Sequence, residues 1–144
     1  MIHYIVFRTQ ALATEDAAKV RQAFAAVLLP ETPISEELTE GYFGNPITIL
    51  TARIENKKQA DSYMELLRTK LHPSDLEELK KELPDRVDEG CNFYLKLSKQ
   101  DAYLGDWRIT YAEDAIVIRA KIAAFPAKYE SALKQAREYF HAEE

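Results

Sequence analysis

The side chains best suited to chemistry lie in one short polar segment, where Lys99 and Gln100 precede Tyr103. A lysine can neutralise a phosphate, an amide can hydrogen-bond to the edge of a nucleobase, and a tyrosine ring can stack on an unpaired base. We expect this segment to be a turn, because it follows a strand-like alternating run and ends at Gly105. The segment therefore suggests a contact surface for nucleic acid.

Basic and aromatic residues also recur at alternate positions of three predicted strands. Successive side chains of a strand point to opposite faces of the sheet. If apolar positions such as Ile5, Phe93 and Ile118 face the helices, the polar residues between them face the other way. Those polar residues are Arg8, Tyr94, Lys96, Arg119 and Lys121. The pattern predicts one sheet face suited to RNA, although a merely solvated face of an antiparallel sheet has the same composition.

Composition limits the classes of protein to which the chain can belong. Its 144 residues, 47% of them hydrophobic, suit a single domain, 1–144, with a substantial core. A formal charge of −5 argues against nonspecific coating of nucleic acid, so RNA contact needs local clusters of basic residues. Cys91 is the only cysteine, which excludes an internal disulfide. The sequence has no apolar run long enough to span a bilayer, and its N-terminal residues do not resemble a signal peptide. We therefore expect a cytoplasmic protein without membrane contact.

The hydrophobic pattern predicts an α+β fold, with a single antiparallel or mixed sheet covered on one face by helices. The predicted strands are 2–12, 34–39, 47–54, 93–98, 107–112 and 115–125. The predicted helices are a segment capped by Thr14 and running to Leu29, then 57–71, 74–83 and a last helix that begins at Pro126. Residues 41–46 predict a sharp turn, and Pro84 is expected to end the third helix.

Signatures of catalysis are missing from the sequence. The histidines His3, His72 and His141 are far apart, and there is no P-loop, nucleophile elbow or cysteine–histidine arrangement. We therefore expect no enzyme, no cofactor and no metal site. The acidic group 85–89 leaves a metal-dependent nuclease as a weaker alternative.

Four segments carry a family resemblance. They are 2–15, with its Arg-Thr and Ala-Thr-Glu runs; 41–47, Gly-Tyr-Phe-Gly-Asn-Pro-Ile; 93–105, centred on Lys99-Gln100; and 124–128, Ala-Phe-Pro-Ala-Lys. Through them the chain resembles an archaeal family of small predicted RNA-binding proteins, often described as predicted exosome subunits. The resemblance implies a fold similar to that of the ribosomal protein that binds 5S rRNA, and it implies no enzymatic activity. Asp101 departs from the family, which tends toward a small neutral residue there.

Together these observations predict a non-catalytic RNA-binding protein of archaeal RNA processing, with the exosome as the candidate partner that the resemblance implies. The expected RNA contacts are Lys99, Gln100, Tyr103, Tyr94, Lys96, Arg8, Arg119 and Lys121. The alternative is a protein-interaction or dimerisation module, such as a homodimer, whose outward aromatic residues and glycine turn contact a partner instead of RNA.

Overall fold

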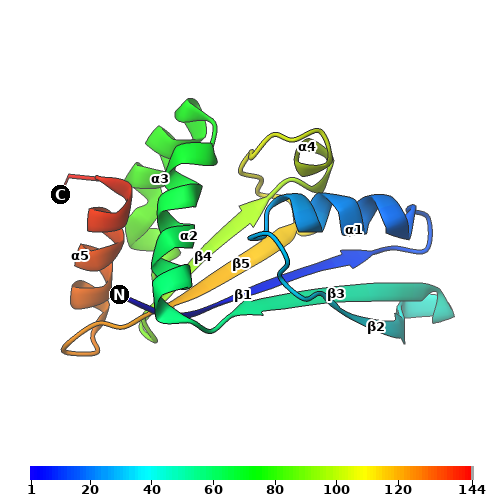
Figure 1. The fold of residues 1–144 in the computed structure, drawn as a ribbon, viewed down its shortest axis with the longest axis horizontal. Helices are drawn as coiled ribbons and strands as arrows, with labels where there is room; N and C mark the ends of the chain where they lie inside the picture. Colours follow the sequence, from blue (N-terminus) through cyan, green and yellow to red (C-terminus); the bar gives the residue numbers. More distant parts are fainter. Residues whose placement is uncertain (144) are drawn as a thin grey trace. The chain divides into compact units, whose positions relative to one another are not determined.

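The computed structural model describes residues 1–143, which form an α+β fold around one five-stranded antiparallel sheet (Figure 1). The strand order is β2-β3-β1-β5-β4. The strands are β1 (Ile2–Ala11), β2 (Ser35–Glu40), β3 (Pro46–Ile54), β4 (Asn92–Leu97) and β5 (Ile116–Ile122). The helices are α1 (Ala17–Ala26), α2 (Lys57–Lys70), α3 (Pro73–Arg86), α4 (Lys99–Tyr103) and α5 (Tyr129–Phe140), with a 3-10 turn at Tyr42–Gly44. The predicted fold class is confirmed.

The described chain forms two compact units. The first contains Met1–Ile5, Ile54–Leu95 and the chain from Arg119 onward, and the second contains Val6–Arg53 and Lys96–Ile118. Strands β1, β3, β4 and β5 contribute residues to both units. None of the helices within residues 1–143 is long and apolar enough to cross a bilayer.

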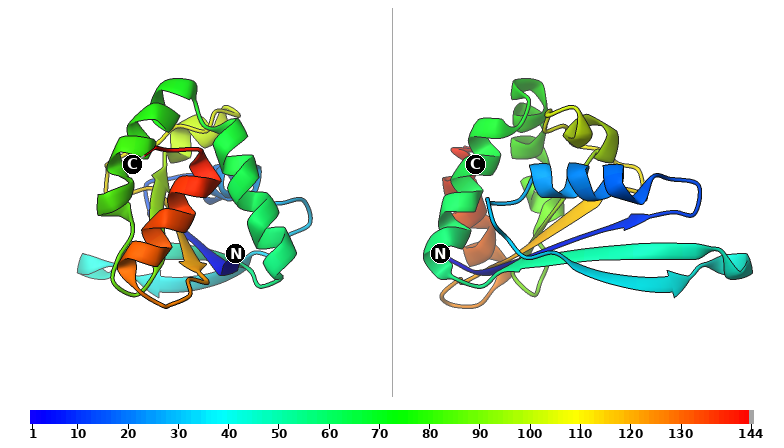
Figure 2. Two further views of the ribbon diagram at one scale, coloured as in Figure 1. Left: turned by 90° about the vertical axis from the view of Figure 1, so that its left-hand side faces the viewer. Right: turned by 45° about the vertical axis from the view of Figure 1, so that its right-hand side comes forward.

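The first unit is built around helix α5, which lies between α2 and α3 (Figure 2). Phe140 of α5 packs against Phe93 of β4, with 5.3 Å between the ring centroids. The Tyr139 hydroxyl donates a hydrogen bond of 2.7 Å to Asp61 Oδ1, which also accepts from the Ile2 backbone amide at 2.9 Å. Burial and these carboxylate contacts raise the pKa of Tyr139 far above its ordinary value, so this hydroxyl keeps its proton as a donor.

Two predictions based on prolines are wrong, namely that Pro84 ends the third helix and that Pro126 begins the last helix. Helix α3 continues through Pro84 to Arg86, although Pro84 has no N–H to donate to the carbonyl four residues earlier. Helical bonding resumes beyond the proline, since the Val87 amide donates to the Leu83 carbonyl at 3.2 Å. Pro126 does not begin the last helix, which starts at Tyr129 after Lys128. The Lys128 amide donates to the Pro126 carbonyl at 2.8 Å, so a tight turn precedes the helix.

The predicted strand 107–112 is also wrong. In this segment Trp107 and Ile109 are isolated bridge residues, and Ile109 pairs with Leu97. Two further backbone bonds flank the bridge, from Ser98 to Arg108 at 2.9 Å and from Thr110 to Lys96 at 3.0 Å. Because β4 ends at Leu97, the segment has too short an edge to pair with and runs on as an irregular loop.

Helix α1 of the second unit begins at Ala17, three residues after the predicted cap, Thr14. The Asp16 carboxylate caps it instead, accepting from the Ala18 amide at 3.0 Å and the Lys19 amide at 3.4 Å. The helix ends at Ala26 rather than at Leu29.

Asp16→Ala is therefore expected to lower the free energy of unfolding by about 1 kcal/mol, because two backbone N–H groups lose their acceptor. Thr14→Ala is the matched control and should change stability little. Urea unfolding of both variants measures the difference, and an equal loss from the two substitutions would refute the cap assignment.

Candidate nucleic-acid interface

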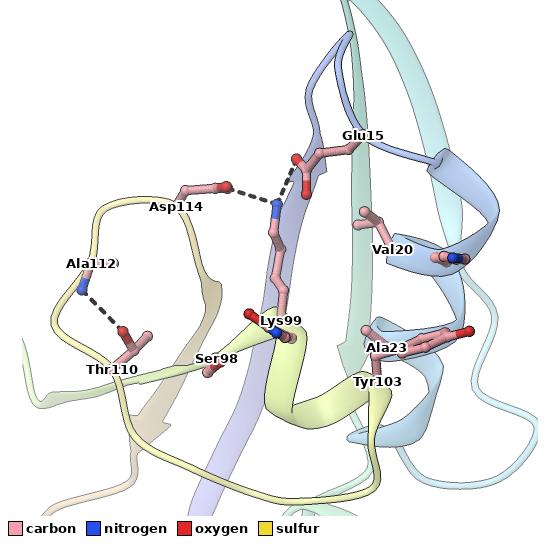
Figure 3. Close-up of a pocket in the computed structure, with 11 residues that line it drawn as sticks. Glu15, Val20, Ala23, Ser98, Lys99, Tyr103, Thr110, Ala112 and Asp114 are labelled. Carbon is pink, nitrogen blue, oxygen red and sulfur yellow. Dashed lines mark hydrogen bonds and ion pairs between the residues drawn. The ribbon is translucent and has the colours of Figure 1, made fainter.

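Helices α1 and α4 of the second unit pack against each other and border a pocket of about 420 Å³ (Figure 3). Val20 and Ala23 of α1 form an apolar part of its wall. Lys99, Gln100 and Tyr103 of α4 complete it, together with residues of the loop 110–114. The structure thus brings together all three residues of the predicted contact segment and adds a wall from α1 that the sequence did not reveal.

The predicted turn at 99–103 is a short helix, α4. Ser98 begins it, since its hydroxyl accepts a hydrogen bond of 3.2 Å from the Asp101 amide. Asp101 lies in the first helical turn, where a carboxylate is favoured by the unpaired N–H groups. Gly105 ends the segment with φ of 88°, a left-handed conformation that glycine adopts without strain. Asp101, which departs from the small neutral residue of the family, therefore suits the start of a helix.

Lys99 is held by three oxygen atoms. Its Nζ donates to the Gln10 carbonyl at 2.9 Å, to Glu15 Oε1 at 2.8 Å and to Asp114 Oδ1 at 2.9 Å, and its side chain is only 11% exposed. An ammonium group has three donors, so all of them are used. A phosphate contact by Lys99 would have to displace one of these partners, and it stays a prediction.

The charges around Lys99 compensate one another. Burial tends to raise the pKa of Glu15, but hydrogen bonds from Lys99 and from the Leu12 amide outweigh it and hold that pKa below its ordinary value. Two positive groups, Lys19 and Lys99, and two negative groups, Glu15 and Asp114, line the pocket. Because their formal charges sum to zero, the pocket as a whole does not attract an anion strongly.

Tyr103 and Gln100 offer the pocket's accessible recognition groups. The Tyr103 side chain extends from α4 toward Ala23 of α1 and is 44% exposed (Figure 3). The ammonium of Lys19 lies 5.9 Å from the centroid of its ring. Gln100 is exposed, with an amide that can both donate and accept. Lys19 was missed from the sequence, because no pattern along the chain showed that α1 packs on α4.

The strand residues follow the predicted alternation. Phe93, Leu95 and Leu97 of β4 are buried, as are the alternate residues from Ile116 to Ile122 of β5. Arg8 is exposed and Lys96 is half-buried, and neither side chain has an ionic partner within the described residues. Both belong to the second unit.

Three predicted contacts belong to the first unit and have internal partners. The Tyr94 hydroxyl donates to Asp88 Oδ2 at 3.1 Å, and Arg119 lies near Tyr94. Burial and then Asp88 raise the pKa of Tyr94, which Arg119 only partly offsets. Lys121 donates to the carbonyl of Gly90. A single surface shared by these residues and those of the second unit stays a prediction.

Asp88 is a structural residue of the turn before β4. Its Oδ1 accepts from the amides of Gly90 and Asn92, each at 2.9 Å, while Oδ2 accepts from Tyr94. Burial tends to raise the pKa of Asp88, but these hydrogen bonds lower it overall. Among residues 1–143, no group of three or more His, Cys, Asp or Glu side chains is placed to hold a metal ion. The carboxylate of Asp88 is thus already used to close a turn.

Comparison with known proteins identifies relatives along nearly the whole chain. The model of a family described as RNA binding matches residues 4–122. The RNA-binding protein PAB1135 of Pyrococcus abyssi is 39% identical over 148 residues, covering 99% of this chain and 96% of that protein. An uncharacterised protein of Methanocaldococcus jannaschii, MJ0213, is 35% identical over 111 residues, covering 72% and 73% of the two chains.

Two solved structures share the fold. Mth689 of Methanothermobacter thermautotrophicus, a DUF54 protein, is 36% identical with a TM-score of 0.82, covering 97% of this chain and 98% of that one. AF2318 of Archaeoglobus fulgidus is 27% identical with a TM-score of 0.87, covering 96% and 99%. The match of the family model and the extent of these similarities show that the chain belongs to an archaeal family of RNA-binding proteins.

Proposed function

We propose that the protein binds RNA without catalysing a reaction on it, and that the α1–α4 pocket holds one unpaired base. The observation that carries this proposal is Tyr103, a half-exposed ring in a pocket, with a lysine ammonium over it. Recognition of RNA commonly relies on bases that are splayed out of a helix and stacked on aromatic side chains. The membership of the chain in an RNA-binding family supports the same proposal.

The chemistry of the pocket favours a base over a phosphate. Its four charged groups sum to zero, and the donors of Lys99 are occupied. Val20 and Ala23 are buried and give an apolar wall against which a flat ring can rest. Gln100 supplies an amide that can hydrogen-bond to a base edge. In this proposal Lys99 positions α4, and Tyr103 and Gln100 contact the RNA.

Phosphate contacts are assigned to cations outside the neutralised cluster. In the second unit these are Arg8 and Lys96. In the first unit Lys121 donates to a backbone carbonyl, and Arg119 lies near the neutral Tyr94 hydroxyl. Their positive charge is therefore still available to attract phosphate, and Tyr94 becomes a supporting residue.

We further propose that this binding serves RNA processing in the cytoplasm of an archaeon, with the exosome as the specific partner. The support is the resemblance of segments 41–47 and 93–105 to predicted exosome subunits. Gel filtration of the purified protein with a reconstituted archaeal exosome tests the association. Co-elution is expected, whereas separate elution with and without RNA would contradict it.

The test of RNA binding compares a hairpin RNA that contains one bulged nucleotide with the same hairpin fully paired. We expect the bulged RNA to bind more tightly, and both affinities to fall as salt rises from about 50 mM to about 200 mM, because phosphate contacts release counterions. Fluorescence anisotropy measures both. If neither RNA binds at low salt, the protein does not act on RNA in this way. If the two hairpins bind equally, the protein binds RNA but the proposal that the pocket holds an unpaired base is wrong.

A further inference from the structure

Strand β2 lies at the end of the sheet, and all six of its residues are exposed. On one side it pairs with β3, so that Glu37 lies opposite Ile49 and Thr39 opposite Ile47. No strand within residues 1–143 pairs with its other side. A free strand edge presents N–H and C=O groups that can form a ladder with another chain.

The charge of β2 restricts which chain can pair with it. Its sequence, Ser-Glu-Glu-Leu-Thr-Glu, contains three carboxylates and no basic residue. Glu36 forms an ion pair with Arg21 of α1, whereas Glu37 and Glu40 have no such partner in the described part of the chain. Pairing with a second copy would bring carboxylates close to one another, which is destabilising. The negative charge of β2 also repels RNA. Because this charge attracts basic groups, the segment best suited to pair with β2 is extended and basic.

Exposed apolar side chains accompany this edge. Leu38 of β2 is 74% exposed, and Phe43 at the tip of the β2–β3 hairpin is 90% exposed. The backbone of Phe43 has φ of 72°, a left-handed conformation that residues other than glycine rarely adopt. The Gly41 amide donates to Asn45 O at 2.7 Å and the Gly44 amide to Gly41 O at 3.0 Å, which fixes this turn. Strained residues of this kind cluster at binding sites.

A pocket of about 280 Å³ adjoins the tip of the hairpin. Its lining is Leu12, Ala13, Thr14, Gly41, Asn45 and Ile47. A Cβ atom at Gly41 would lie 2.6 Å from Ile47 Cδ1, the end of a flexible side chain that would have to shift to make room for it. The pocket is large enough to receive one apolar side chain of a bound segment.

We propose that the β2 edge and the pocket beside the hairpin tip bind an extended basic segment of a protein partner, which pairs with β2 as an additional strand. In such complexes main-chain hydrogen bonds supply affinity, and pockets for alternate side chains supply specificity. Side chains of β2 alternate between the two faces of the sheet, so Glu37 lies on one face and Leu38 and Glu40 lie on the other. Lysine or arginine residues of the bound segment would meet Glu37 on one face and Glu40 on the other, and apolar residues would meet Leu38 and the pocket. This site shares no lining residue with the α1–α4 pocket and does not depend on RNA binding.

The test uses a fluorescent peptide of about eight residues in which pairs of lysines alternate with pairs of valines, so that lysines lie on both faces of the added strand. The peptide is long enough to span a typical strand. We expect it to bind and to slow hydrogen exchange of the β2 amides, measured by NMR. A peptide with glutamate in place of lysine should not bind. Glu37→Lys combined with Glu40→Lys should weaken binding of the lysine peptide by at least about tenfold. Asp85→Lys combined with Glu89→Lys makes the same change of charge at exposed residues of the first unit and should leave binding unchanged.

Several results would overturn the proposal. An equal loss in the two double variants would show attraction by net charge alone, and protection confined to amides outside β2 would place the peptide elsewhere. Equal binding of the glutamate peptide would exclude the charge argument. Protection of β2 by self-association, checked by analytical ultracentrifugation, or by the hairpin RNA would assign the edge to a different occupant.

Discussion

Tyr103→Leu is expected to weaken binding of the bulged RNA by about 5- to 150-fold, which corresponds to the ~1–3 kcal/mol by which one aromatic ring stabilises a stacked base. Leucine keeps an apolar side chain in the pocket but removes the flat ring. Affinity for the fully paired hairpin should change much less, because its bases are already stacked. Anisotropy titrations of both RNAs with wild type and variant measure the two effects.

Two control variants separate the loss of base stacking from other causes of weaker RNA binding. Tyr103→Phe keeps the ring and should bind the bulged RNA nearly as well as wild type. Tyr111→Leu removes another exposed tyrosine, 70% accessible and outside the lining of the pocket, and should have little effect. If Tyr103→Leu binds like wild type, or if Tyr111→Leu loses as much affinity, the assignment of Tyr103 is wrong.

Lys99→Met is expected to lower the free energy of unfolding by about 2–3 kcal/mol, the range for hydrogen bonds to charged groups that are left unmade. Methionine fills the same space but leaves the Gln10 carbonyl and two carboxylates without their common donor. The carboxylates are partly exposed, at 28% and 40%, so water recovers part of the loss. Urea unfolding measures the change, and Lys96→Met is the control with a lysine that has no ionic partner in the described chain.

The pH dependence of this effect has a definite sign. Because the folded pKa of Glu15 is lowered, its ion pair contributes stability above the unfolded pKa of about 4.3. That contribution is lost as the pH falls through the folded value. The difference between wild type and Lys99→Met should therefore shrink below about pH 4. A difference that stays constant from neutral pH to acid would show that the ion pair between Lys99 and Glu15 contributes no stability.

Most strands of the sheet could be predicted, because the alternation of apolar and polar residues marks a strand in the sequence. Every buried position of β4 and β5 holds an apolar residue. Helix α4 escaped prediction because five residues are too few to show a helical period. Its signals were local ones, the hydroxyl of Ser98 and the carboxylate of Asp101 at the helix start.

Only part of the candidate site could be predicted from the sequence. Gln100 and Tyr103 could be chosen by their chemistry, and both line the pocket. The ion pair of Lys99 with Glu15 joins residues 84 positions apart, and no pattern along the chain encodes such a contact. In our proposal that contact makes Lys99 a residue that holds α4 in place, whereas the sequence predicted that it would contact RNA. Lys19 likewise gains significance only from the packing of α1 on α4.

The most direct test of the central claim places the fluorescent base 2-aminopurine at the bulge of the hairpin RNA. Stacking on an aromatic ring quenches this base, so the proposal predicts quenching when wild type or Tyr103→Phe is added. With saturating Tyr103→Leu the fluorescence should stay close to that of the free bulge. Quenching that is equally strong with Tyr103→Leu, or absent while wild-type protein is bound, would contradict the claim that the α1–α4 pocket holds an unpaired base.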